Sequence, residues 1–428
     1  MSRDDLERLT KAELVELVLK LQRPAKTSRT SSKPPSSDNK DRRENSKPGG
    51  ARPGHKGEFR RLADDPDRTV DHRPDLCEGC GQLLAAEISG DVIGEYDAID
   101  LPPVAPVVER HRRLACTCRH CGATTKAPLP AAASGSPFGP NIQALAFYLK
   151  HFQHVSYERL QGLLRDVFGL TISQGALMNL FARGAQLFAA KKAGILGRLR
   201  QAEAVASDET GVRIEGINAQ HWVFRSCDAV VHEAALSRGA QVVRGVMAGH
   251  RPQYWLSDRY SAQQGHGVQH QTCLAHLARD IARILEVGDG AIGLRLKLWI
   301  DEVFGLARAL GSLAASSVKR KRRNLDNRIA DIVRTATSCE ETGAVLRKIA
   351  NARDQLFIFT EAPGLIEPTN NACERALRPA VIHRKVTNGF RAKWAADLDA
   401  AVRTTVDTAR LAGINPYTEI RRTITARS

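Results

Sequence analysis

The chain has 428 residues, with 63 Lys and Arg against 47 Asp and Glu, which gives a net charge of +16. At roughly 100–200 residues per domain, this length excludes a single small module. The content of 42% apolar and 26% charged residues excludes a collagen-like or wholly disordered chain. No apolar run reaches the about 18 residues of a membrane span, and the first residues carry no apolar signal core. We therefore expect a soluble cytoplasmic protein of several domains, and its charge favours a nucleic acid as partner.

The first 66 residues divide into two predicted segments. Residues 1–23 carry apolar residues at helical spacing after the capping-box pair Thr10 and Glu13, which predicts a short amphipathic helix. This helix either pairs with a second copy as a coiled coil or packs locally. Residues 24–66 are rich in Pro, Ser, Gly, Lys and Arg and cannot build a core. They are interpreted as a basic flexible linker that contacts DNA phosphates or, alternatively, is only solvated.

Residues 67–130 contain two C-x-x-C-G turns. Each turn presents two thiolates to a metal ion, and the glycine that follows permits a left-handed backbone. Segments 92–96 and 104–114 between them are β-prone, so we predict a zinc-ribbon-like module with one structural Zn²⁺. Cys116 is an alternative ligand in place of Cys118, and two unrelated reduced thiol turns are the alternative to a site. The predicted zinc ligands are Cys77, Cys80, Cys118 and Cys121.

Helical patterns cover residues 137–200, at 141–154, 156–168 and 173–190. Ser173 stands where it would cap the third of these helices. The last two patterns are typical of a helix-turn-helix that binds DNA, although helices that merely connect two domains would give the same signal.

From residue 201 the pattern changes to strands. Segments 204–214 and 220–227 flank a turn at 215–218, and a third strand is predicted at 229–235. A helix at 240–248 precedes a short apolar strand that ends in Asp258. Helical sequence then continues from 274 to about 358 and includes the exposed basic run 319–323. We predict an α+β, multi-domain protein whose mixed sheet with helices carries a helical insertion at about 285–360, with 396–428 as a C-terminal helical tail.

Three acids stand out by position. Asp208 lies in a predicted strand, Asp258 at a strand end, and Glu374 in the first turn of a predicted helix. A meander, a further strand and then a helix is the order in which RNase H-like folds bring three carboxylates together. Two Mg²⁺ or Mn²⁺ ions about 4 Å apart need such oxygen ligands for phosphoryl transfer. The alternative roles are a turn residue for Asp208, an N-cap for Asp258, and a capping-box partner of Asn371 for Glu374.

Basic and amide side chains surround Glu374. Arginine and lysine pair with phosphate, and an asparagine amide can hydrogen-bond it, so this helix is a candidate DNA-binding surface or, alternatively, a solvated basic helix. His276, in the pattern Cys273-Leu-Ala-His276, is interpreted as a structural support of the site. The candidate DNA-binding residues are Asn370, Asn371, Arg375, Arg378, Arg384 and Lys385.

At these residues the sequence resembles the IS66 family of bacterial insertion-sequence transposases, which are DDE-type recombinases. The resemblance covers most of the chain in order, and its longest block is Asn370-Asn-Ala-Cys-Glu-Arg-Ala-Leu-Arg-Pro379. It implies that Asp208, Asp258 and Glu374 are the catalytic triad of an RNase H-like domain at 201–395, which holds the magnesium ions. Other matching blocks lie at 31–38, 53–57, 207–210, 257–260 and 273–276.

The resemblance implies a DNA transposase that binds the terminal inverted repeats of its element and catalyses metal-dependent strand cleavage and strand transfer by in-line phosphoryl transfer. The implied partners are element and target DNA, further copies of the chain assembled on DNA, and small accessory proteins, in the nucleoid and away from membranes. Two alternatives remain: a zinc-containing DNA-binding regulator without catalysis, and an RNase H-like nuclease that cuts without joining.

Overall fold

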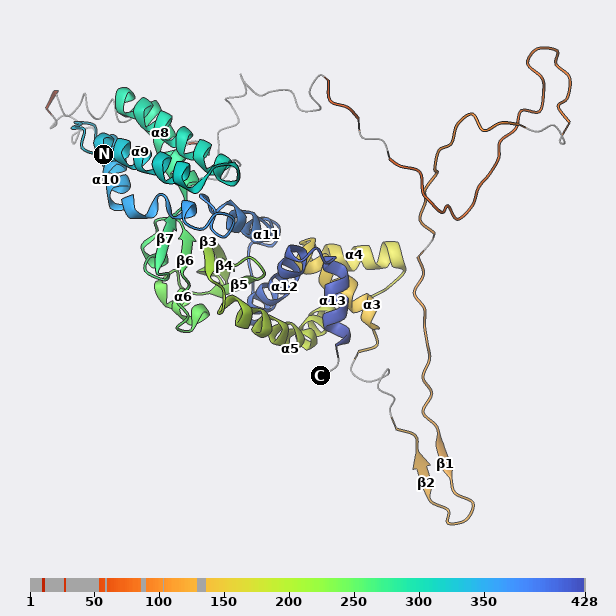
Figure 1. The fold of residues 1–428 in the computed structure, drawn as a ribbon. Helices are drawn as coiled ribbons and strands as arrows, with labels where there is room; N and C mark the ends of the chain where they lie inside the picture. The colour runs from red at the N-terminus through yellow and green to blue at the C-terminus, as the bar shows by residue number, and fades with distance from the viewer. Residues whose placement is uncertain are drawn as a thin grey trace. The chain divides into compact units, whose positions relative to one another are not determined.

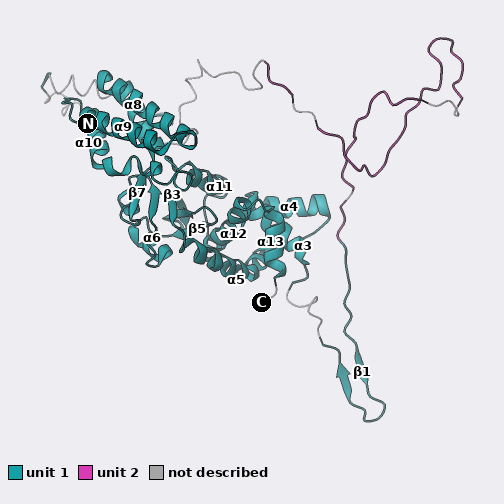
Figure 2. Ribbon diagram, in the orientation of Figure 1, with its two compact units in different colours: residues 1–38, 107–428 teal, residues 39–106 magenta. Residues whose placement is uncertain are grey.

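The computed structural model describes residues 10–11, 27, 54–57, 60–85, 90–102, 104–128 and 136–426. The chain forms two compact units, residues 39–106 and residues 1–38 with 107–428 (Figure 2). The predicted helix at 1–23 and most of the basic linker at 24–66 lie outside the described residues. Within the described ranges, no helix has the length and apolar character needed to cross a membrane.

A five-stranded mixed sheet is the centre of the larger unit (Figure 1). Its strands lie in the order β5-β4-β3-β6-β7, in which β3, β4 and β5 form an antiparallel meander and β6 and β7 pair in parallel beside β3. The predicted α+β fold with a mixed sheet is thus confirmed. The strands are β3 (Ala204–Ile214), β4 (Ile217–Arg225), β5 (Val230–Ala235), β6 (Tyr254–Ser257) and β7 (Gln269–Thr272).

The β3–β4 hairpin is tighter than its sequence suggests. Ile214 pairs with Ile217, so the loop holds only Glu215 and Gly216, with φ angles of 54° and 79°. Positive φ at both central residues is typical of a type I′ turn, whose twist matches that of the strands. The turn therefore fixes the register that sets Asp208 opposite Val223.

Helices cover both faces of the sheet. Alternate residues of a strand point to opposite faces. Trp222 and Phe224 pack with α5 (Gln174–Leu199) and α6 (Ala240–Met247), whereas Val223 packs with α11 (Asn371–Thr387). The helix that carries Glu374 is therefore held on one face of the sheet by its own apolar residues, Cys373 and Leu377.

The edge strand β5 is covered by α12 (Lys393–Leu411). The backbone N–H of His232 donates to Thr404 Oγ1 at 2.9 Å, and that of Val230 donates to Thr408 Oγ1 at 3.0 Å. An edge strand otherwise exposes such groups as a template for aggregation. The predicted division between residues 395 and 396 falls inside α12, so the segment after it is packed on the sheet rather than a separate tail.

A helical region precedes the sheet in the chain. It comprises α3 (Pro140–Phe147), the π-helical turn η4 (Tyr148–Phe152), α4 (Tyr157–Phe168) and α5, and it shares a core with α12 and α13 (Pro416–Thr425). Ser173 Oγ accepts a hydrogen bond from the Ala176 N–H at 3.1 Å, so the predicted cap of α5 is confirmed. The helix continues nine residues beyond the predicted end at 190, to Leu199.

After the sheet, four helices pack around Trp299, whose indole N–H donates to the Leu325 carbonyl at 3.0 Å. They are α7 (Leu274–Val287), α8 (Gly290–Ala309), α9 (Ala315–Val333) and α10 (Glu340–Asn351). They confirm that helices follow Asp258, but the sequence reading missed β7, which lies between them and β6. Short 3₁₀ turns are η5 (Ser261–Gln263), η6 (Leu310–Ser312), η7 (Arg353–Gln355) and η8 (Ile358–Thr360).

The β-structure predicted at 92–96 and 104–114 is wrong. The described residues of both segments contain no strand, and a hairpin of β1 (Ala115–Thr117) and β2 (Thr124–Lys126) forms instead. A segment becomes a strand only where a partner accepts and donates its backbone hydrogen bonds. Apolar side chains of these segments, such as Ile93 and Val107, are exposed and supply no core.

Candidate active site and cysteine turns

The parallel pairing of β3 with β6 brings two of the three predicted acids to one place. Ala206 pairs with Leu256, and Asp208 and Asp258 each lie two residues further along their chains. Parallel neighbours that advance together end at the same edge of a sheet. Glu374 reaches this region from the first turn of α11, which packs on β3 and β4.

The pKa of Asp208 reflects its buried and acidic surroundings. Burial raises the pKa of Asp208 well above its usual value, and the charges of Glu209, Asp258 and Glu374 raise it further. One hydrogen bond, from the Glu209 N–H to Asp208 Oδ1 at 2.9 Å, opposes them. Charge repulsion weakens with distance, so these contributions agree with the pairing of β3 with β6 and the packing of α11 on β3, which bring the three acids to one region.

Two side chains of α7 face Glu374. Arg279 Nη2 lies 3.4 Å from Glu374 Oε2, and His276 Nε2 lies 3.9 Å from Glu374 Oε1. Burial lowers the pKa of His276, the Arg279 charge adds to this, and Glu374 and Asp258 oppose it. The alternative in which Glu374 caps its helix with Asn371 is wrong, because the N-cap is Asn370 and it makes no side-chain capping bond.

Asn370 is a structural residue in this fold. Its side chain Nδ2 donates to the Ser207 carbonyl at 2.8 Å, and its backbone N–H donates to Cys273 Sγ at 3.1 Å. The residue is 1% exposed, which is inconsistent with the DNA contact predicted for it. It ties the start of α11 to the strand residue before Asp208.

We expect Asn370→Ala to lower the free energy of unfolding by about 1–3 kcal/mol, because the buried Ser207 carbonyl loses its donor. Asn371→Ala, one residue along in a half-buried position, is the matched control. Chemical denaturation of both variants measures the difference. Equal stabilities would show that the hydrogen bond to Ser207 does not hold α11 in place.

The remaining predicted DNA-binding residues lie on α11. Arg375, Arg378 and Lys385 are exposed, and Asn371 is half-buried. Arg384 is also half-buried, and its guanidinium donates to the Gly211 carbonyl of β3. Arg375 and Arg378 are therefore open to solvent beside Glu374, whereas Lys385 is exposed in the last turn of α11 and Arg384 contributes to packing.

Sequence reasoning missed a second buried carboxylate. Glu209 Oε1 accepts hydrogen bonds from Arg238 Nε at 2.9 Å and Nη2 at 2.7 Å, and Oε2 accepts from Gln263 Nε2 at 2.7 Å. Arg238 also stacks over the Tyr260 ring at 4.0 Å. Burial raises the pKa of Glu209, while Arg238 and Gln263 oppose this. No sequence spacing indicates that Glu209 is buried and paired, because Arg238 reaches it only in the folded chain.

The two predicted cysteine turns have the same geometry. The Gly81 N–H donates to the Cys77 carbonyl at 2.8 Å, and the Gly122 N–H donates to the Cys118 carbonyl at 2.9 Å. Both glycines have positive φ, 71° and 73°, as the C-x-x-C-G pattern predicts. The Cys116 side chain lies on β1, outside either turn.

Backbone N–H groups favour the thiolate in both turns. Those of Cys80 and Gly79 lower the pKa of Cys77, and those of Cys121 and His120 lower the pKa of Cys118. The thiolate is the form that binds a metal. Cys77 and Cys80 belong to one compact unit and Cys118 and Cys121 to the other. Among the described residues, no three His, Cys, Asp or Glu side chains lie close enough together to hold a metal ion, and this applies to the cysteine turns and to Asp208, Asp258 and Glu374 alike.

Comparison with known proteins identifies the class to which this fold and site belong. Residues 135–398 match the family described as "Transposase IS66 family", and residues 74–122 match the "zinc-finger binding domain of transposase IS66". The uncharacterized protein y4hP of Sinorhizobium fredii (strain NBRC 101917 / NGR234) is 23% identical over 390 residues, which cover 82% of this chain and 70% of that protein.

The chain belongs to the IS66 family of transposases. The family match covers the sheet and α11 and ends within α12, and the zinc-finger match covers both cysteine turns. The resemblance inferred from the motifs is confirmed.

Proposed function

We propose that this transposase cleaves DNA at the ends of an insertion sequence and joins the freed ends to target DNA, with Asp208, Asp258 and Glu374 as its catalytic acids. The observation that carries the proposal is that the pairing of β3 with β6 and the packing of α11 on β3 bring Asp208, Asp258 and Glu374 to one region of the sheet, beside solvent-exposed arginines. The order of the sheet, a meander followed by two parallel strands, supports an RNase H-like catalytic core.

The three carboxylates have the chemistry of a divalent-metal site, and binding an ion would draw them closer together than they lie here. Carboxylate oxygens are the ligands that Mg²⁺ and Mn²⁺ prefer, and a bound cation would offset the burial and the neighbouring negative charges that raise the pKa of Asp208. Asp208 and Asp258 would hold the ions, with Glu374 completing the site in exchange for its pairing with Arg279. When bound, the metals stabilise the attacking and leaving oxygens of an in-line displacement.

The protein's own groups orient the DNA. Arg375 and Arg378 are placed to hold the scissile phosphate beside Glu374, and Asn370 fixes the helix from which they project. Water is the nucleophile in the cleavage step, and the freed 3′-hydroxyl takes its place in the joining step, so one arrangement of acids serves both.

A strand-transfer assay on DNA carrying the element's ends, with Mg²⁺ or Mn²⁺, tests the proposal. We expect wild type to yield cut and joined products, and Glu374→Gln to lose at least about a hundredfold in rate. Glu367→Gln, an exposed carboxylate just before α11, is the control and should retain activity. Products that are cut but never joined would favour the nuclease alternative, and binding without cutting would favour the regulator.

The cysteine turns support one structural Zn²⁺ held by Cys77, Cys80, Cys118 and Cys121, in a module at 67–130 that engages the terminal repeats. We further propose that residues 137–200 contribute DNA contacts through the α4–α5 helix pair, and that residues 1–66 assist DNA binding or self-association.

We expect purified wild type to hold about one zinc per chain, and Cys77→Ser and Cys118→Ser each to lose most of it, because a tetrahedral site lacking one thiolate binds Zn²⁺ weakly. Cys116→Ser is the matched control and should keep its zinc. Metal analysis by mass spectrometry measures this. Full zinc in Cys118→Ser with loss in Cys116→Ser would reassign the ligand to Cys116.

A further inference from the structure

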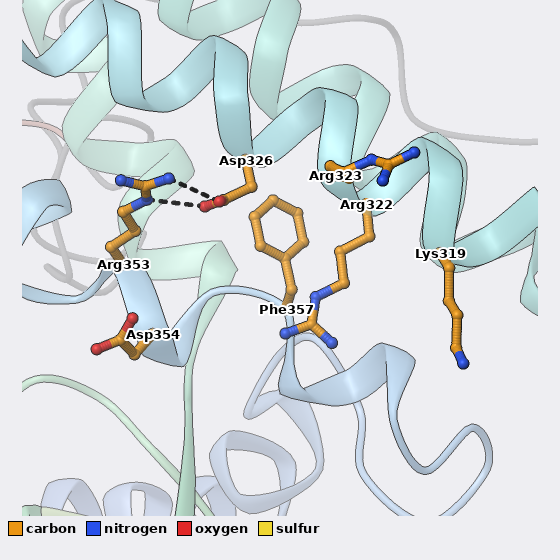
Figure 3. Close-up of a pocket in the computed structure, with 7 residues that line it drawn as sticks. All are labelled: Lys319, Arg322, Arg323, Asp326, Arg353, Asp354 and Phe357. Carbon is orange, nitrogen blue, oxygen red and sulfur yellow. Dashed lines mark hydrogen bonds and ion pairs between the residues drawn. The ribbon is translucent and has the colours of Figure 1, made fainter.

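One flank of α9 carries more positive charge than the structure neutralises. Val318, Leu325 and Ile329 bury the inner face of this helix. Lys319, Arg322 and Arg323 follow one another at helical spacing on the neighbouring flank and are named here the α9 stripe. Together with Asp326, Arg353, Asp354 and Phe357 they line a cavity of about 410 Å³ (Figure 3).

Only some of these charges are paired. Arg353 donates to both oxygens of Asp326, at 2.9 and 2.7 Å, and Arg322 Nη1 donates to Glu361 Oε1 at 2.9 Å. Lys319 and Arg323 make no ion pair with any residue that the structure describes. Like charges one helical turn apart repel, so the stripe weakens the helix unless an anion covers it.

One residue of the α9 stripe also lines a second cavity, which hydrogen bonds connect with the candidate active site. Arg322 and Asp354 also line a second cavity, of about 500 Å³, with Gln355 in its wall. Gln355 Nε2 donates to Gln264 Oε1 at 3.2 Å, and Gln264 Nε2 donates to the Asp258 carbonyl at 3.2 Å. Two hydrogen bonds thus connect the wall of this cavity with the backbone of a candidate catalytic acid.

We propose that the α9 stripe binds the sugar–phosphate backbone of double-stranded DNA that flanks the cleavage site. This inference rests on the proposed function. The DNA that is cut at the acids is the same DNA whose flanking phosphates contact α9. A duplex carries one charge per about 1.7 Å of its axis, which suits cations repeated along a helix. Lys319 and Arg323 are the cations left to hold phosphates, because Arg322 pairs with Glu361 and Arg353 pairs with Asp326.

The chemistry of the helix favours DNA over an acidic protein. The core of a protein interface is rich in apolar and aromatic side chains. On α9 no large apolar side chain is exposed, and the neighbours of the stripe, Arg320 and Lys321, add two more exposed cations. A surface of this kind contacts phosphates without reading bases.

The test measures the salt dependence of duplex binding. Binding of a labelled duplex is followed by fluorescence anisotropy in EDTA, for the full chain and for Lys319→Gln/Arg323→Gln. Each lost phosphate contact lowers the slope of log affinity against log salt by about 0.9, so we expect a decrease of about 1.8. Lys297→Gln/Arg334→Gln removes two exposed cations of α8 and α9 that pair with Asp301 and Asp331, and should leave the slope unchanged.

An unchanged slope and affinity in the stripe variant would overturn the inference and leave an acidic protein as the partner to seek. Equal losses in both double variants would overturn it too, because the effect would then be one of net charge. Binding in EDTA requires no catalysis, so a wild type that never cuts DNA would defeat the proposed function without altering this result. Thermal unfolding confirms that both variants are folded.

Discussion

The Asp208→Asn variant is expected to lose at least about a thousandfold in the rate of DNA strand cleavage and to be more resistant to heat than wild type when no metal is present. Asn has almost the size of Asp but no charge, so it cannot hold a divalent cation as a carboxylate does, and electrostatic groups at reacting centres are typically worth a factor of 10²–10³ or more. The gain in stability follows from the pKa of Asp208, which burial and then Glu209, Asp258 and Glu374 raise.

The raised pKa of Asp208 determines the sign of this change in stability. A carboxyl whose pKa is raised on folding stabilises the native state when it is protonated, and that stability is lost as the pH rises through the raised pKa. At neutral pH, where the unfolded chain has an ionised Asp208, this side chain therefore costs the metal-free native state stability, either by ionising in a buried acidic site or by taking up a proton, and Asn removes the cost. Adding Mg²⁺ should raise the melting temperature of wild type and leave that of Asp208→Asn almost unchanged.

Cleavage of end DNA and thermal unfolding with EDTA or Mg²⁺ measure both parts of this prediction. Asp301→Asn, which removes an exposed carboxylate of α8, is the control for charge and should behave as wild type. An Asp208→Asn protein that cuts DNA normally would show that Asp208 is not catalytic. One that melts earlier than wild type in EDTA would show that the carboxyl is a stabilising contact instead.

A second large effect is expected at Asp399, a buried carboxylate outside the candidate active site. Asp399 lies on α12 and is 1% exposed, and it accepts hydrogen bonds from Arg403 Nε at 2.6 Å and from His151 Nδ1 at 2.9 Å. Burial opposes its ionisation, but Arg403 and His151 outweigh burial and hold its pKa well below the usual range. Asp399→Ala leaves the guanidinium buried without a partner, which costs about 3–5 kcal/mol.

Chemical denaturation of Asp399→Ala, Arg403→Leu and the double variant measures this cost. The double variant should recover part of the loss, because it leaves no unpaired buried charge. A loss below about 1 kcal/mol in Asp399→Ala, or additive losses in the double variant, would mean that the buried Asp399–Arg403 pair and the hydrogen bond from His151 of η4 do not stabilise the fold.

Much of the sheet could be predicted because its strands carry their own signals. The strands β3, β4 and β5 contain Val, Ile, Trp and Phe, residues that favour strands, and the turn at Glu215 and Gly216 marks the first reversal of the meander. The strand β7, Gln-His-Gln-Thr, has no such signal. It is a strand because it pairs with β6, and because its buried Gln271 accepts a hydrogen bond from the Phe359 N–H at 2.9 Å.

The candidate site, like the sheet, could be predicted only in part from the sequence. Asp208, Asp258 and Glu374 could be proposed from their positions at a strand, a strand end and a helix start. The burial of Asn370 and the Glu209–Arg238 pair could not, because both depend on side chains that meet only after the helices dock on the sheet. The hairpin of β1 and β2 differs from expectation for a related reason, since β-prone segments form strands only where partners lie beside them.

The most direct test of the central claim is metal rescue of Asp208→Cys and Asp258→Cys in the cleavage assay. Thiolate sulfur binds Mg²⁺ poorly and the softer Mn²⁺ better. If these carboxyls are metal ligands, both variants should be inactive in Mg²⁺ and regain measurable cleavage in Mn²⁺, whereas wild type cuts in both. Cleavage by either variant in Mg²⁺ at the wild-type rate, or no recovery by either in Mn²⁺ while wild type remains active, would contradict the account.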